Sequence, residues 1–260
     1  MLVRARGTLQ QTLVLGIILA LAVLAWAATL VVPETPLASA LSHAHGGGLD
    51  RSAQAPALGG VALFLVGWTV MTAAMMLPTA LPMVATFARV AQTRPRAGRR
   101  VLLFVLGYLT AWAGFGVLAY VADLFVHRAV DASPFLASHT SLIGGGTLVL
   151  AGLYQLTPLK RRCLRQCRSA LSFLMAYWRE GPLGAWQMGA HHGMFCVGCC
   201  WALMLVMFGL GMLQLAWMLG LALLMFAEKV ARGGERIGQL TAPVFVFLGL
   251  LAAGGAGSWS

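Results

Sequence analysis

Residues 101–125, VLLFVLGYLTAWAGFGVLAYVADLF, contain a single charged side chain, Asp123. A helix needs about 20 mostly apolar residues to cross the hydrocarbon core of a bilayer. Comparable runs occur at roughly 11–32, 58–86, 140–158, 186–208, 212–228 and 237–257. The sequence therefore predicts an all-α protein, a polytopic transmembrane helix bundle with about seven spans.

The overall composition also favours a membrane protein. Hydrophobic residues make up 60% of the 260 residues and charged residues make up 10%. Soluble domains average about 45–50% apolar and about 25% charged residues. A soluble protein of this size could not bury so much apolar surface, so we expect the lipid bilayer to be its main partner.

The net charge is +11, and the distribution of the basic residues along the chain indicates a membrane topology. The amino terminus and the loops at 87–100, 159–185 and 229–236 hold 16 of the 18 basic residues, and the loops at 33–57 and 126–139 hold the other 2. Basic residues beside apolar segments stay in the cytoplasm. We therefore expect a multi-pass protein of the bacterial inner membrane, with its N-terminus inside, and no nucleic-acid binding.

The predicted spans divide the chain into three parts. Residues 1–57 hold the first transmembrane helix and an outer loop with His43 and His45, which could capture a metal ion. Residues 58–236 form the candidate metal-binding membrane core, and residues 237–260 form a C-terminal transmembrane helix. The first apolar run is longer than the 7–15 residues of a signal peptide core, so we favour an uncleaved helix.

Three features complicate this simple pattern of spans. Pro78 and Pro82 predict a kink within 58–86, which either serves packing or opens the helix beside a site. Glu228 stands beside Lys229, with Arg232 one turn on, and this predicts a solvated helix end with an internal ion pair, or alternatively a proton or cation role for Glu228. In 159–185, apolar residues at helical spacing among arginines predict an amphipathic helix on the inner leaflet: Leu164, Leu171, Leu174, Met175 and Trp178.

The densest group of candidate metal ligands lies in the span 186–208. Spacings of four, four and three residues put Met188, His192, Cys196 and Cys199 on one helical stripe, with Cys200 on its shoulder. Thiolates and thioethers select Cu(I), and imidazole suits copper and zinc. Copper is therefore the expected metal, with zinc as the alternative.

A facing helix would have to complete such a site, because one helical face supplies only two or three donors. Gly193 and Gly198 lack bulk and would admit that helix, and Met204 follows Cys200 by four residues. The competing interpretation is plain packing, since free cysteine behaves as a small hydrophobe and methionine fills gaps in cores.

Two further groups offer sulfur donors. Met71, Met75 and Met76 lie within six residues on the span 58–86 and could face the cysteine helix or pack as aliphatic core. Cys163 and Cys167 are four residues apart in the basic loop 159–185. These two thiols could accept or deliver a metal ion, or they could be ordinary thiols near the headgroups.

Three stretches together resemble a known family: His192-Gly-Met-Phe-Cys196-Val-Gly-Cys199-Cys200-Trp201-Ala-Leu-Met204, Trp68-x-x-Met71-x-x-x-Met75-Met76-x-Pro78, and Ala151-Gly-Leu-Tyr154-Gln155-Leu-Thr-Pro158-Leu-Lys160-x-x-Cys163-Leu-x-x-Cys167-Arg168. The family is that of the bacterial predicted metal-binding integral membrane proteins of domain of unknown function 2182, some labelled copper chaperones. The resemblance covers roughly residues 58–229. It implies metal binding by His192, Cys196, Cys199 and Cys200 as a set, and it places Cys163 and Cys167 in the family pattern.

These observations leave three functional hypotheses. The first is a Cu(I) carrier or membrane metallochaperone that serves a copper-accepting protein. The second is a membrane thiol-redox enzyme using Cys196 and Cys199, which have C-x-x-C spacing. The third is a structural or assembly subunit. The chain lacks a phosphate-binding glycine loop, a nucleophile elbow and an HExxH motif, which argues against a hydrolase; the oligomeric state stays open.

Overall fold

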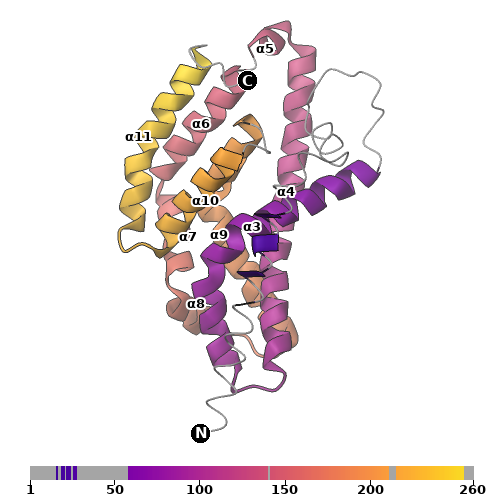
Figure 1. The fold of residues 1–260 in the computed structure, drawn as a ribbon, viewed down its shortest axis with the longest axis vertical. Coiled ribbons are helices and arrows are strands. Elements are labelled where there is room, and N and C mark those ends of the chain that lie inside the picture. Colours follow the sequence, from indigo (N-terminus) through magenta and orange to yellow (C-terminus); the bar gives the residue numbers. More distant parts are fainter. Residues whose placement is uncertain are drawn as a thin grey trace.

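The computed structural model describes residues 58–139, 141–210 and 215–254, together with scattered residues between Gly16 and Ala27. The loop with His43 and His45 and most of the predicted first span lie outside the described residues. Within the described ranges every regular element is an α-helix (Figure 1). In chain order they are α3 (Leu58–Ala91), α4 (Ala97–Ala132), α5 (Pro134–Ser138), α6 (Ser141–Gln155), α7 (Pro158–Arg168), α8 (Ala170–Tyr177), α9 (Gly181–Leu210), α10 (Leu215–Val230) and α11 (Gly234–Ala253).

The prediction of an all-helical, apolar chain is confirmed for this part of the molecule. Four of the described helices, α3, α4, α9 and α11, are long and apolar enough to cross a membrane. Helices α6 and α7 meet at a bend of 69° and would make a fifth span if they act as one broken span. Seven spans and an inward N-terminus stay predictions.

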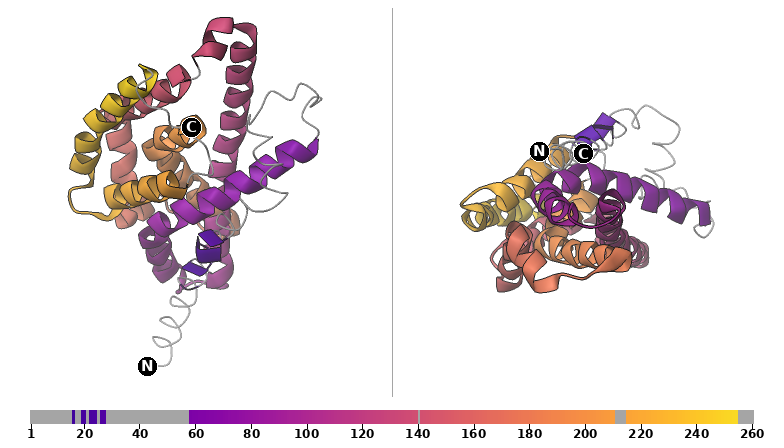
Figure 2. Two further views of the ribbon diagram at one scale, coloured as in Figure 1. Left: turned by 45° about the horizontal axis from the view of Figure 1, so that its top comes forward. Right: turned by 90° about the horizontal axis from the view of Figure 1, so that it is seen from below.

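The longest helices pack closely because glycines face backbone at their crossings. A Cβ at Gly193 of α9 would lie 2.7 Å from the Cβ of Ala111 and 2.9 Å from the carbonyl oxygen of Tyr108, both on α4. Gly145 of α6 faces the backbone of α11 in the same way, near Gly249. Small residues are the usual means by which membrane helices approach closely. Figures 1 and 2 show α6 running beside α11 at one edge of the molecule.

The two prolines of α3 do not end the helix, which continues to Ala91 and changes direction along its length (Figure 1). Proline at position 78 leaves the carbonyl of Ala74 without its helical N–H donor. The indole N–H of Trp26 donates to this oxygen at 3.2 Å. The predicted kink is therefore confirmed, and a side chain from outside α3 supplies the missing donor, as membrane helices require.

The prediction of a single helix across 159–185 is wrong, whereas its placement on the inner leaflet stays a prediction. The segment forms two helices, and α7 packs against α9 inside the protein. Leu164 and Leu174 are buried, whereas Leu171 and Met175 remain exposed. The arginines of α7 suggested a surface helix, but two of its charged residues, Lys160 and Arg168, have acceptors on α10.

The prediction of a solvated end of α10 is also wrong, because Glu228 is buried and pairs with a distant residue. Its carboxylate accepts from Lys160 Nζ at 2.7 Å, and each side chain is only 2% exposed. Gln155 donates to the same carboxylate at 2.9 Å, and Lys160 also donates to Gln155. Arg168 Nη1 donates to the backbone carbonyl of Glu228 at 2.7 Å. Glu228 thus holds both ends of α7 against α10.

Candidate metal centre

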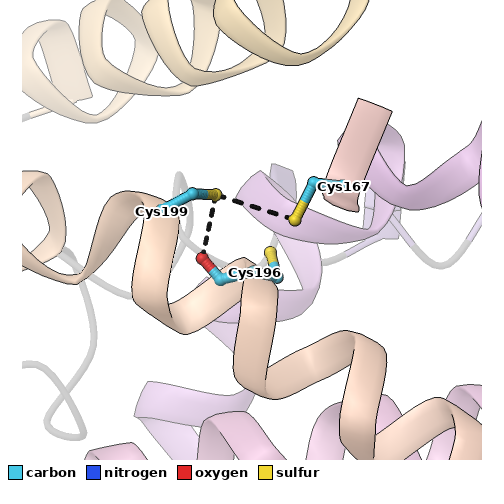
Figure 3. A group of neighbouring side chains, drawn as sticks. All are labelled: Cys167, Cys196 and Cys199. Carbon is cyan, nitrogen blue, oxygen red and sulfur yellow. Dashed lines mark hydrogen bonds between the residues drawn. The ribbon is translucent and has the colours of Figure 1, made fainter. Parts of the chain in front are cut away.

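Three cysteine thiols from two helices converge in the core. Cys196 and Cys199 lie on α9, and Cys167 reaches them from α7 (Figure 3). Their three sulfur atoms lie within 4.8 Å of one another. The Cys167 and Cys199 sulfurs are 3.8 Å apart. Among the described residues this is the one group of three or more histidine, cysteine or acidic side chains so placed; we call it the three-thiol group.

The bend between α6 and α7 brings Cys167 to α9. Thr157 caps α7, accepting from the Lys160 backbone N–H at 3.3 Å, and Pro158 suits the first helical turn. Where α7 crosses α9, a Cβ at Gly198 would lie 2.7 Å from the Cys163 sulfur. The Tyr154 hydroxyl donates to the carbonyl of Gly198. The expectation that Gly198 admits a neighbouring helix is confirmed, and that helix carries Cys163 and Cys167.

Cys200 and Met76 form the edge of the centre next to α3. The Cys200 thiol donates to the Cys196 carbonyl at 2.8 Å and lies 3.9 Å from the Met76 sulfur. Both residues are buried. Met76 is therefore the member of the predicted methionine set that the structure brings to the cysteine helix. Met71 and Met75 are buried in the core on α3, and Met204 is buried on α9 beyond Cys200.

His192 is buried one turn before Cys196, in an aromatic box rather than in the three-thiol group. Its ring lies 5.3 Å from that of Phe173 and 5.9 Å from that of Tyr108, measured between centroids. Its Nδ1 atom has no hydrogen-bond partner among the described residues. Cys163 is half-buried beside Gly198, one turn before Cys167. His192 and Cys163 therefore lie beside the three-thiol group, and Cys167 is one of its members.

Sequence reasoning missed two polar residues that contact the centre, Lys229 and Tyr108, and a third, Thr79, that contacts Lys229. Lys229 of α10 donates to the Cys196 sulfur at 3.0 Å and to Thr79 Oγ1 at 3.0 Å. The Tyr108 hydroxyl lies 3.0 Å from the same sulfur. A signal for Lys229 was present in the sequence. Its i−4 and i−3 neighbours on the helix, Met225 and Phe226, are apolar, and this pattern is compatible with an inward-facing lysine. The positive-inside pattern instead places Lys229 among the cytoplasmic charges.

The arrangement can bind a soft metal ion. Three thiols that lose their protons would give three thiolates within reach of one ion, and thiolates favour Cu(I) and zinc. Cys196 and Cys199 are buried and Cys167 is partly buried, and burial strengthens electrostatic interactions. Zinc sites normally have four ligands, whereas the group supplies three thiols with a lysine ammonium beside one of them.

Apolar helices around three thiols from two helices fit a class of protein: an all-helical chain that handles a thiophilic metal ion. Residues 64–252 match the model of the PpoB2 family, described as copper chaperone. Since the match covers most of the chain, the protein belongs to this family. Neither a curated protein nor a solved structure gives a significant match.

Proposed function

We propose that the protein is an integral membrane copper-handling protein, a Cu(I) carrier or a membrane metallochaperone that passes the ion to an accepting protein. The observation that carries this proposal is the three-thiol group, whose members come from α7 and α9 and whose sulfurs lie within 4.8 Å of one another. The copper chaperone description of the family supports the choice of metal. The apolar length of α3, α4, α9 and α11 supports insertion in a bilayer.

Cu(I) is the cargo in this proposal, and Cys167, Cys196 and Cys199 are its primary ligands. Cys200 and Met76 lie next to the group and provide weaker donors for an ion that enters or leaves. Further sulfur donors lie on either side of the group: the buried Met71, Met75 and Met204 and the half-buried Cys163. His192 adds a buried imidazole. Several weak sites suit movement, because an ion that is held too tightly does not leave.

A thiol-redox function is the second candidate, and one distance favours a particular pair for it. The Cys167 and Cys199 sulfurs are 3.8 Å apart and come from different helices. Cys196 and Cys199 lie on one continuous helix, and the Cys199 thiol donates to the Cys196 carbonyl at 3.1 Å. If the protein forms a reversible disulfide, the pair expected is therefore Cys167–Cys199.

Metal content decides between the two functions. The full chain, purified in detergent under reducing, oxygen-free conditions, is titrated with limiting Cu(I) beside two variants. The first replaces Cys167, Cys196 and Cys199 by serine, and the matched control is Cys163→Ser, which lies outside the three-thiol group. We expect about one copper per parent chain, none in the triple variant and unchanged content in the control, because limiting Cu(I) fills the primary ligands before any weaker site. A parent without copper that forms a disulfide would favour redox chemistry.

A further inference from the structure

The ammonium group of Lys229 lies inside the candidate metal centre without an acidic partner. It contacts the Cys196 sulfur at 3.0 Å, Thr79 Oγ1 at 3.0 Å and the Met76 sulfur at 3.6 Å. The residue is 8% exposed. Among the described residues no carboxylate lies within ion-pair distance of it, because Glu228, its neighbour in sequence, pairs with Lys160.

A buried charge is costly unless an opposite charge or hydrogen bonds compensate for it. The nearest group able to carry a negative charge is the Cys196 thiol. The ammonium is therefore positioned to compensate for thiolate charge in the three-thiol group. Its position is fixed by its own helix, α10, and by contacts with Thr79 and Met76 of α3.

We propose that Lys229 determines specificity by making the three-thiol group favour a monovalent over a divalent metal ion. This inference rests on the proposed function and adds the reason for its ion selectivity. Three thiolates with Cu(I) keep two net negative charges, and three thiolates with Zn(II) keep one. The lysine ammonium leaves one negative charge on the copper complex and none on the zinc complex. Without it, the copper complex is left with two uncompensated charges in a buried site.

Removing the ammonium therefore harms the copper complex more than the zinc complex. The two complexes differ by one negative charge. The effect of removing the ammonium therefore differs between them by the interaction energy of one unit charge with the lysine. At about 4 Å and an effective dielectric constant of about 20, that interaction corresponds to roughly a hundredfold to a thousandfold in relative affinity. Cu(I) and Zn(II) share a filled d shell, so ligand-field effects do not contribute to the comparison.

The test compares Cu(I) and Zn(II) dissociation constants for the full chain in detergent, using chelator competition under reducing conditions. The variants are Lys229→Met, which removes the charge at similar length, and Lys229→Arg, which keeps the charge. We expect Lys229→Met to lower the ratio of Cu(I) to Zn(II) affinity by about a hundredfold or more. Lys229→Arg should keep the parent ratio within a few-fold.

An unchanged ratio in a folded Lys229→Met protein that binds both metals would overturn the inference. If Lys229→Met does not fold, Lys229→Gln provides the same comparison with a neutral side chain that keeps a hydrogen-bond donor. Ag(I) and Cd(II), a pair with the same electron count and different charge, give an independent check, because the inference requires Lys229→Met to lower that affinity ratio as well. An Ag(I)-to-Cd(II) ratio that the substitution leaves unchanged would also overturn it. A parent that binds no Cu(I) would instead contradict the proposed function.

Discussion

Replacing Glu228 by glutamine should destabilise the protein strongly, although the change removes only a charge. The carboxylate accepts from Lys160 at 2.7 Å, and both side chains are 2% exposed. Glutamine at this position leaves the Lys160 ammonium buried without an opposite charge. Removing one partner of a buried ion pair costs about 3–5 kcal/mol. For a chain of this size, each kcal/mol shifts the melting temperature by roughly 2–4 °C, so a fall of about 10 °C is expected.

The assay is thermal unfolding of the detergent-solubilised full chain, followed by loss of helical signal. Glu235→Gln is the matched control, because Glu235 lies in the first turn of α11 and has no ion pair among the described residues. That control should change stability by less than about 0.5 kcal/mol. Adding Lys160→Met to Glu228→Gln should recover most of the loss, because no unpaired charge then remains. A Glu228→Gln protein that melts with the parent would refute the reasoning.

Three further outcomes follow from the contacts. Gly107→Ala should destabilise the fold by about 1–3 kcal/mol through overpacking, because a Cβ there would meet the backbone of α9, 2.9 Å from the Ala190 nitrogen. Gly114→Ala on the same helix meets open space and should not destabilise the protein. Thermal unfolding of both variants tests this difference. Tyr108→Phe removes a hydroxyl 3.0 Å from the Cys196 sulfur and should weaken Cu(I) binding about tenfold in chelator competition. The indole N–H of Trp178, aided by Arg94 and Arg100, lowers the pKa of Glu180. This carboxylate therefore stabilises the fold at pH values above the ordinary glutamate pKa, and the stabilisation is lost as the pH falls through the lowered pKa. The difference in melting temperature between parent and Glu180→Gln should vanish in acid.

The helical architecture could be predicted because local composition decides it. Residues 97–132 form α4, which contains the predicted span at 101–125, since a long apolar run with few charges has few stable alternatives to a helix. The stripe with Cys196 and Cys199 was found for a similar reason, because helical periodicity fixes which residues share a face.

The contribution of other elements to the centre was harder to predict. Cys167 entered the group through a 69° bend and a close crossing at Gly198, and neither is visible in periodicity. Lys229 and Glu228 were assigned to a solvated helix end because charged residues near span ends usually are solvated. Tertiary partners on α3 and α7 reversed that assignment, which one sequence without its contacts could not reveal.

The central claim is that Cu(I) binds to cysteine thiolates from both α7 and α9. Copper-edge X-ray absorption of the loaded full chain tests it most directly, with the Cys167→Ser variant measured beside the parent and Cys163→Ser as control. We expect a first shell of about three sulfur atoms in the parent and in Cys163→Ser, falling by one in Cys167→Ser. A parent shell of nitrogen or oxygen atoms, or a sulfur shell that does not change when Cys167 is replaced, would contradict the account.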